Sequence, residues 1–378
     1  MILRHGRPLR DVAGCVPEER SLLEKLRQFA RDRAAGHPGL FHPQDFPSDL
    51  FRAMGEARLL GATDLGTIAR GDAIIAEATG SLGFASAWAG QSMVPLVLDK
   101  RAGLPAAVKA GVATGETIIS LAISEPKAGA HPKHLAATAT RVSGGWRLDG
   151  EKAYVTNGPI ASHLAVLAIT EAGGWRKQFS FFLVPTGTPG LNRVDHPQFD
   201  FLRPAQHCGF RLEGCVVPES ALIGTPGKGF AEIALPFRNL EDAAGIGGLI
   251  AVLKHASRRL VARLPAPITD EIALVLGEIA GLETAMQALD DRLIGMLEAW
   301  NTETDEAGIR LVAIRDLARR QAAALRELGP HGDEHINRIL RDVEKSLDIA
   351  RVARQIRKAR LGRSHFTPGQ SPSGKSAE

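Results

Sequence analysis

The spacing of apolar residues divides the chain into three consecutive regions. From Glu18 to about Ala113, apolar residues recur at the spacing of one face of a helix. Because such a face is buried against neighbouring helices, this pattern predicts an N-terminal helical domain over residues 1–116. The residues that carry the pattern include Leu22, Leu23, Leu26 and Phe29, and then Leu50, Phe51, Met54, Leu59 and Leu60.

The middle of the chain has a different pattern. Between Thr117 and about Ile223 it consists of short runs rich in Ile, Val, Phe and Thr, bounded by Gly, Pro and Asn. Two of these runs flank Ser143-Gly144-Gly145, which indicates a β-hairpin. We predict a central β-sandwich or barrel-like domain over residues 117–224. Its expected strands are Thr117–Ser124, Ala136–Val142, Trp146–Leu148, Ala153–Thr156, His163–Thr170, Phe179–Val184 and Phe210–Val217.

The helical period returns after Gly229 and continues almost to the end of the chain. Four long segments of this kind predict a C-terminal four-helix bundle over residues 225–364, and the whole is an α+β multidomain protein. The last residues, 365–378, are polar and rich in Pro, Gly and Ser, which predicts a disordered tail. The expected helices are Phe230–Arg263, Thr269–Ala299, Glu303–Leu328 and Asp333–Leu361.

Composition narrows the class of protein. A chain of 378 residues with 44% apolar and 23% charged residues is long enough to bury sizeable cores and is neither disordered nor fibrous. It has no run of 18 or more apolar residues without a charge, so we expect no membrane span. Three cysteines, an odd number without metal-ligand spacing, favour a reducing compartment, and we expect a cytoplasmic protein without a metal.

Three motifs occur in order across the predicted β domain. Residues 124–129 read Ser-Glu-Pro-Lys-Ala-Gly, residues 150–158 read Gly-Glu-Lys-Ala-Tyr-Val-Thr-Asn-Gly, and Val-Pro-Glu-Ser precedes Gly-Lys-Gly-Phe at 227–230. In these motifs the sequence resembles the acyl-CoA dehydrogenase family, flavoenzymes that desaturate acyl-CoA thioesters. The resemblance extends from about Phe46 to Gly329. It implies a helical, β and helical-bundle architecture, FAD as cofactor, an acyl-CoA substrate, an acceptor such as an electron-transfer flavoprotein, and a homodimer or homotetramer.

The resemblance also implies which residues contact the flavin. A flavin ring needs hydrogen-bond donors at the edges where negative charge develops, and an apolar wall that excludes water. By resemblance, Thr156 donates toward N5, Ser124 toward the pyrimidine end, and Tyr154 lies against the ring in place of the usual Trp. The strand residues Leu121 and Ile123 complete this set. For Ser and Thr alone the alternative is a local role at strand ends.

The base that removes the substrate α-proton is expected to be a carboxylate in an apolar pocket, where its pKa rises toward working pH. In most of the family this Glu lies in a Tyr-Glu-Gly-Thr motif late in the bundle, but here Ala350 stands at that position. In the isovaleryl-CoA and long-chain types it lies on the first bundle helix, where this chain has Glu241. By resemblance Glu241 is the candidate base. The alternative is a helix carboxylate in solvent, next to Asp242.

Other positions bear on substrate and cofactor binding. The resemblance brings Arg238 and Asn239 near the acyl-CoA, and Ala130 stands where the family has a polar residue facing the thioester arm. The family's Arg-x-x-Phe-Gly motif, which reaches a flavin phosphate across a subunit interface, is absent between Arg258 and Pro267. Arg258, Arg259 or Arg263 could supply that contact instead.

Two further hypotheses follow from these departures. One is a member of the same fold that is not a dehydrogenase, either a flavin-dependent oxygenase-type protein or a non-catalytic partner subunit. The other is nucleic-acid binding through the C-terminal helix, which has six cations and no acidic residue between Arg351 and Arg363. We consider nucleic acid the weaker hypothesis, because cations at a helix C-terminus also stabilise the helix dipole.

Overall fold

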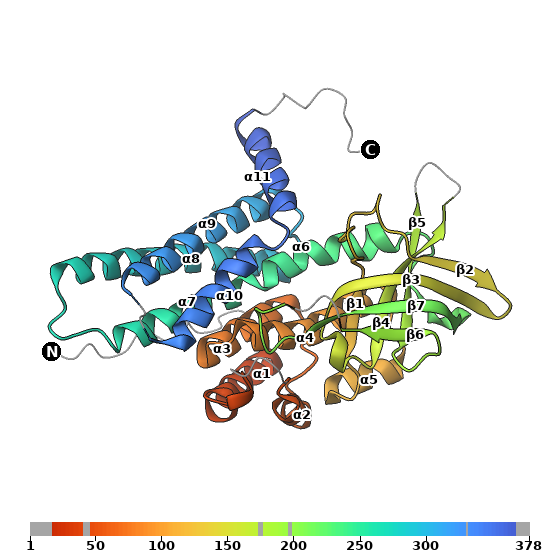
Figure 1. Ribbon diagram of the computed structural model, residues 1–378, viewed down its shortest axis with the longest axis horizontal. Coiled ribbons are helices and arrows are strands. Elements are labelled where there is room, and N and C mark those ends of the chain that lie inside the picture. The colour runs from red at the N-terminus through yellow and green to blue at the C-terminus, as the bar shows by residue number, and fades with distance from the viewer. Residues whose placement is uncertain (1–16, 41–45, 173–176, 196–198, 330–331, 368–378) are drawn as a thin grey trace.

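The computed structural model describes residues 17–40, 46–172, 177–195, 199–329 and 332–367. Helices lie on either side of the sheet in sequence, and in Figure 1 the sheet occupies one end of the molecule. Because the described residues end at 367, the predicted tail over residues 365–378 lies outside them, apart from the end of the last helix. The helices that precede the sheet are α1 (Pro17–Phe29), α2 (Ser48–Glu56), α3 (Leu65–Thr79), α4 (Leu82–Ala102) and α5 (Ala106–Thr114).

Side-chain caps define where the two central N-terminal helices begin. Asp64 accepts a hydrogen bond from the Thr67 backbone N–H at 2.7 Å and so starts α3, and Ser81 accepts one from Phe84 at 3.2 Å and so starts α4. Both helices are buried over most of their length. The Trp88 indole donates to the Leu59 carbonyl at 2.8 Å, which fixes the chain before α3 against α4.

The sheet consists of β1 (Ile119–Ala122), β2 (Thr138–Val142), β3 (Gly145–Thr156), β4 (His163–Glu171), β5 (Gln178–Pro185), β6 (Leu191–Val194), β7 (His207–Pro218) and β8 (Leu222–Ile223). Its order is β6-β7-β3-β2-β4-β5-β8, and β1 pairs with β4 in parallel. The sheet curls around its own core, because Trp146 on β3 meets Phe182 on β5 although two strands separate them.

Two predicted strands are one strand in the structure. Trp146–Leu148 and Ala153–Thr156 both belong to β3, which continues through two register shifts against β7. Gly150 and Tyr154, both at positive φ, lie at these shifts. The prediction missed β6 and β8, which have four and two residues and too little pattern to be recognised.

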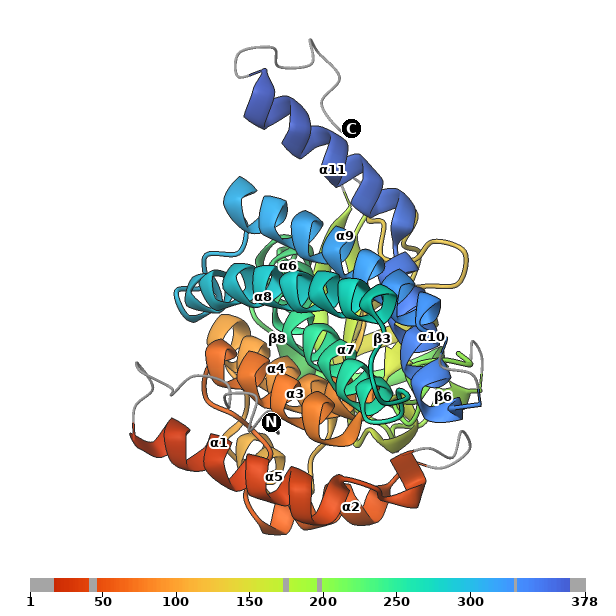
Figure 2. The same cartoon turned by 90° about the vertical axis from the view of Figure 1, so that its left-hand side faces the viewer.

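The helices after the sheet are α6 (Leu235–Ala244), α7 (Ile246–Val261), α8 (Asp270–Glu298), α9 (Asp305–Glu327), α10 (Glu334–Asp348) and α11 (Arg351–Phe366). Figure 2 shows α8 and α9 above α7 and α10, with α3 and α4 beneath them. Short helical turns complete the chain at Ala30–Ala34, Pro38–Leu40, Gly158–Ile160, Glu219–Ala221 and Phe230–Ala234.

The prediction of unbroken helices at 230–263 and 333–361 is wrong. The first segment begins with a wide π-turn before Pro236, which has no N–H for a helical hydrogen bond, and divides again at Gly245. The second segment breaks at Ala350, which has left-handed φ and ψ. There the last carbonyls of α10 accept hydrogen bonds from side chains, because Arg319 donates to Leu347 and Arg354 to Ser346.

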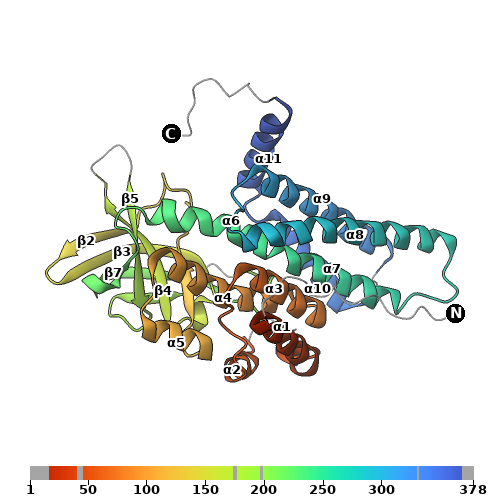
Figure 3. The same ribbon diagram turned by 180° about the vertical axis from the view of Figure 1, so that it is seen from behind.

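The N-terminal helices and the bundle share one hydrophobic core, whereas the inside of the sheet forms a second. Helices α3 and α7 pack closely together, and Gly248 of α7 leaves no room for a side chain beside Asp72 of α3. One described helix, α8, is long and apolar enough to cross a membrane by length and composition alone. It lies along α9 on the outside of the bundle (Figure 3).

Candidate active site

The first two sequence motifs are joined by a buried ion pair. Lys152 Nζ lies 2.9 Å from Glu125 Oε1, and the two side chains are 0% and 7% exposed. The Glu125 carboxylate also accepts the backbone N–H groups of Ala136 and Ala137, and Lys152 donates to the Ile123 carbonyl at 3.2 Å. Burial lowers the pKa of Lys152, and the negative charge of Glu125 partly opposes this decrease. The pair therefore positions the segment after β1 against β3.

The two segments that carry the predicted flavin contacts of the β domain meet at this junction. The Ala153 N–H donates to the Ser124 carbonyl at 2.8 Å, so the segment directly after β1 lies beside the C-terminal part of β3. Among the described residues, the hydroxyls of Ser124 and Thr156 have no hydrogen-bond partner, and both residues are half-buried. Leu121 and Ile123 are half-buried beside them. Two free donors on one rim are what a flavin edge requires.

Tyr154 projects outward from the irregular part of β3. It is 43% exposed, and its ring stacks on Phe199 with centroids 5.5 Å apart and planes 14° from parallel. Phe199 in turn contacts His207, where burial and Arg203 lower the pKa of the imidazole to about 4. One ring face of Tyr154 is thus covered by protein, and its remaining exposed surface is available to a planar ligand.

Asn157 ties this rim to the N-terminal helices. Its amide donates to the Ala87 carbonyl on α4 at 2.8 Å, and its Oδ1 is buried without a partner among the described residues. Sequence reasoning did not single out Asn157, Glu125 or Lys152. The available signal was that these polar residues lie within or directly beside the motifs quoted above, where a buried polar group needs a partner.

Glu241 lies on α6, at the position proposed for the base. Its side chain is exposed, yet the surrounding protein displaces enough water to raise the pKa of its carboxyl to about 7. Asp242 adds to this rise, and Arg354 opposes it. A carboxyl that is accessible and titrates near neutrality is suited to take a proton from a ligand. Among the described residues, no contact joins Glu241 directly to Ser124, Tyr154 or Thr156.

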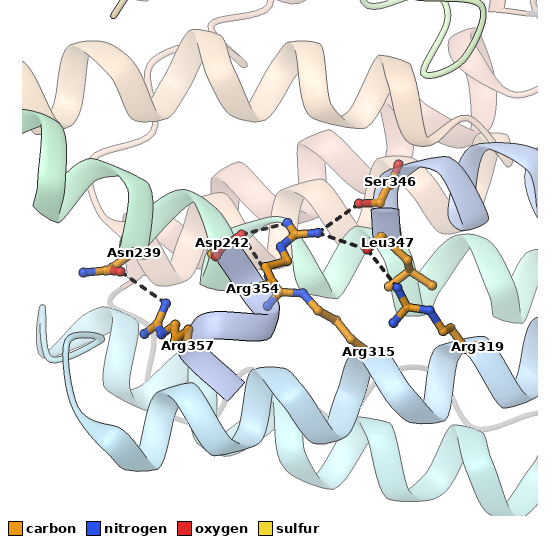
Figure 4. A network of polar contacts seen from close by, with 8 residues as sticks. All are labelled: Asn239, Asp242, Arg315, Arg319, Ser346, Leu347, Arg354 and Arg357. Atoms are coloured by element: carbon orange, nitrogen blue, oxygen red, sulfur yellow. Dashed lines mark hydrogen bonds and ion pairs between the residues drawn. The ribbon is translucent and has the colours of Figure 1, made fainter. Parts of the chain in front are cut away.

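Asp242 forms ion pairs with two arginines that the sequence did not suggest. Its Oδ1 accepts hydrogen bonds from Arg315 of α9 at 2.8 Å and from Arg354 of α11 at 3.0 Å (Figure 4). Its charge is therefore balanced within the protein. An acid beside Glu241 need not repel an anionic substrate, since these two arginines already compensate it.

The remaining predicted substrate residues lie on two separate elements. Asn239 is buried on α6, and its Oδ1 accepts a hydrogen bond from Arg357 at 3.3 Å (Figure 4). Arg238 is exposed on the same helix, while Ala130 is exposed in the turn after Glu125. The structure thus brings Arg238, Asn239 and Glu241 together on α6 and leaves Ala130 on the β side.

A basic pocket of about 580 Å³ lies at the C-terminal end of α7. Each of its arginines already has a carboxylate partner: Arg258 pairs with Glu77, and Arg259 and Arg263 share Asp333. Three arginines thus face two carboxylates, which leaves one positive charge in excess. His255 also lines the pocket, and burial lowers its pKa.

The C-terminal helix does not present its cations as one outer stripe. Arg354, Arg357 and Lys358 turn inward and contact α6 or α9. The outward positions include the apolar residues Val352 and Ile356, at 69% and 65% exposure. Within the described ranges, no group of three or more His, Cys, Asp or Glu side chains is arranged to hold a metal ion.

Comparisons with known proteins agree with this architecture. The family model for the acyl-CoA dehydrogenase middle domain matches residues 120–215. The chain is 29% identical over 381 residues to isovaleryl-CoA dehydrogenase, mitochondrial, of Solanum tuberosum, covering 92% of this chain and 90% of that protein. It is 28% identical to benzylmalonyl-CoA dehydrogenase of Aromatoleum aromaticum over 87% of this chain and 93% of that protein.

Solved structures share the fold at lower identity. Butyryl-CoA dehydrogenase from Megasphaera elsdenii superposes with a TM-score of 0.81 at 18% identity, covering 96% of this chain and all of that chain. A glutaryl-CoA dehydrogenase from Mycobacterium smegmatis in complex with FADH2 has a TM-score of 0.80 at 20% identity, covering 94% and 96%. The family-model match to the middle of the chain, the relatives matched over about nine tenths of it and the shared fold all support the acyl-CoA dehydrogenase family.

Proposed function

We propose that this protein is an FAD-dependent oxidoreductase that introduces an α,β double bond into an acyl-CoA thioester, with Glu241 as the base. The observation that carries the proposal is the Glu241 carboxyl, accessible to a ligand and with a pKa raised to about 7. The relatives named isovaleryl-CoA dehydrogenase, matched over about nine tenths of this chain, support this position, since the sequence resemblance implies a base on the first bundle helix in that type.

The rim of the β domain fits the ring of FAD. The free hydroxyls of Ser124 and Thr156 would donate to the polar edges of the ring, and the exposed surface of Tyr154 would contact the ring. When bound, FAD supplies a two-electron acceptor that takes the β-hydrogen of the substrate as hydride. The buried pair of Glu125 and Lys152 holds the rim in place, so that these donors need no reorganisation.

Glu241 would supply the other half of the reaction. Its ionised carboxylate takes the α-proton while the α C–H bond breaks, so the two carbon atoms lose one proton and one hydride in total. The raised pKa is useful here, because a base whose pKa lies near working pH is both ionised in good part and strong enough to accept the proton.

The pocket at the end of α7 is the place we propose for the flavin phosphates of a second subunit. Arg258, Arg259 and Arg263 line it, as expected if they replace the missing arginine motif. The exposed face of α8 is suited to close packing against a second copy, because small residues occupy it. They are Ala273, Gly277, Ala280, Gly281, Thr284 and Ala288. We therefore propose a homodimer or homotetramer.

The electron acceptor and compartment follow from the same proposal. We propose an electron-transfer flavoprotein or another protein acceptor, and a cytoplasmic location. Two of the three thiols, Cys208 and Cys215, are free and buried, which is compatible with a reducing compartment.

The test is an anaerobic titration of the FAD-loaded protein with a panel of straight-chain, branched and aromatic acyl-CoA esters. Bleaching of the flavin band by one ester supports the proposal and identifies the acyl class. A protein that takes up no FAD is instead a non-catalytic member of the fold. One that binds FAD but is reduced by no ester favours the oxygenase-type alternative.

A further inference from the structure

A second cavity lies apart from the flavin rim, between α9 and α11. It has a volume of about 430 Å³, within the range of small-molecule sites, and every residue that lines it comes from α9, the end of α10 or α11. No strand contributes to it. Six of its side chains are cationic, and we call this cavity the arginine pocket. They are Arg315, Arg319, Arg351, Arg354, Arg357 and Lys358.

The arginine pocket has more positive than negative charge. Its cations contact three carboxylates: Asp242 accepts from Arg315 and Arg354, Asp316 lies 2.6 Å from Lys358, and Asp348 lies 3.3 Å from Arg319. Glu241 lies near Arg354 and Asp305 near Arg357, so six cations face five carboxylates and the pocket keeps a net positive charge.

Two of the arginines make no ion pair with a carboxylate among the described residues, although Asp242 and Asp305 lie close enough to act on Arg357. Arg357 is half-buried and donates only to the neutral amide of Asn239. Arg351 is exposed at the first position of α11, and no contact of its side chain occurs among the described residues. Burial lowers the pKa of Arg315 to about 10; Asp242 opposes this shift, and the neighbouring Arg354 and Arg357 add to it.

Such an arrangement is stabilised by an anion with several oxygens. Guanidinium groups bind phosphate oxygens in pairs, with two parallel N–H donors to two oxygens. The first backbone N–H groups of α11 add to this attraction, since Ala350 provides no side-chain cap. A carboxylate ligand would satisfy one arginine, whereas a phosphate or pyrophosphate group has enough oxygens to accept from both Arg351 and Arg357.

We propose that the arginine pocket binds the phosphate groups of a small anionic ligand, with Arg351 and Arg357 as its unpaired anchors. Two sources share this chemistry: the nucleotide end of a CoA thioester, or a separate phosphorylated effector. The first source rests on the proposed function. The second does not require that the protein be a dehydrogenase.

The test is calorimetric titration of the full-length protein with inorganic pyrophosphate at two salt concentrations, for the wild type and for R351Q and R357Q. We expect wild-type binding that weakens with salt, and a loss of about tenfold in affinity for each variant. The matched control is R360Q, which removes an exposed cation of the same helix that does not line the pocket, and it should change the affinity less than twofold. Thermal unfolding of each variant confirms that it is folded.

Two results would overturn the proposal. One is a wild type that binds neither pyrophosphate nor CoA, and the other is binding that is the same in R351Q, R357Q and R360Q. A parallel titration with CoA separates the sources. If the two pocket variants weaken CoA binding, the ligand is the nucleotide end of the substrate; if they weaken only pyrophosphate binding, it is a separate phosphorylated molecule. Neither readout uses turnover, so a failure of the proposed oxidation would appear separately.

Discussion

Lys152 and Glu125 form an ion pair of 2.9 Å that is almost fully buried and connects β3 to the turn after β1. The two residues lie 27 positions apart in two different motifs. Glu125 directly follows Ser124, and Lys152 lies two positions before Tyr154, both of which are proposed to contact the flavin. Such a pair costs free energy to desolvate and is retained where it specifies one arrangement of the backbone. Its consequence here is a rigid rim that carries Ser124 and Thr156.

Replacing Lys152 with Met should destabilise the protein strongly. Glu125 would remain buried without its cation, and removing one partner of a buried pair costs about 3–5 kcal/mol. Urea unfolding at neutral pH measures the change. The control is Arg147→Gln, whose ion pair with Asp149 is 49% and 40% exposed and should contribute less than about 1 kcal/mol. Equal losses in the two variants would contradict the structural role of Lys152.

The rate of flavin reduction should depend on pH through Glu241. Only the ionised carboxylate accepts a proton, so the rate should rise with pH and level off above about pH 7. Arg354 lowers the pKa of Glu241, so Arg354→Gln should move the rising limb to higher pH. Stopped-flow reduction at a series of pH values measures both, with Arg360→Gln as the control. An unmoved limb in Arg354→Gln would argue against this coupling.

Gly248 is required by the close approach of α3 and α7. A Cβ at this position would overlap the Asp72 carboxyl, so Gly248→Ala should lower the unfolding free energy by about 1–3 kcal/mol through overpacking. Gly362→Ala is the matched control, because a Cβ at that helical glycine meets no atom within 4 Å. It should be neutral or stabilise by up to about 1 kcal/mol. Chemical unfolding of both variants distinguishes a packing effect from a general one.

Asp290 should make the stability depend on pH. Burial raises the pKa of Asp290 from 3.8 to about 7, so the folded state holds a proton that the unfolded state releases. Its contribution to stability is therefore greatest below about pH 4 and is lost as pH rises to about 7, by on the order of 2–4 kcal/mol. Asp290→Asn removes this dependence. Its stability relative to the wild type should increase between pH 4 and 7 and stay constant above, and a constant difference throughout would refute the assignment.

Much of the fold could be predicted, because helices and strands leave periodic patterns in the sequence. The breaks in the helices could not. The chain breaks at Ala350 between α10 and α11, where Arg319 and Arg354 donate to the last carbonyls of α10, and the Arg319 contact spans 28 positions. The candidate site likewise combines residues that a sequence motif indicates with contacts that only the fold creates. Glu241 could be proposed from a motif. Asp242, however, accepts a hydrogen bond from Arg354, which lies 112 positions away, so the cation that compensates its charge was visible only in three dimensions.

The central claim is that Glu241 accepts the α-proton of an acyl-CoA while FAD is reduced. The most direct measurement compares the anaerobic rate of flavin reduction in the wild type and in Glu241→Gln, using the ester that reduces the wild type fastest. The account predicts that Glu241→Gln binds FAD and substrate normally but is reduced about 10²–10⁴ times more slowly. Reduction of Glu241→Gln at the wild-type rate would contradict it and assign proton removal to another group.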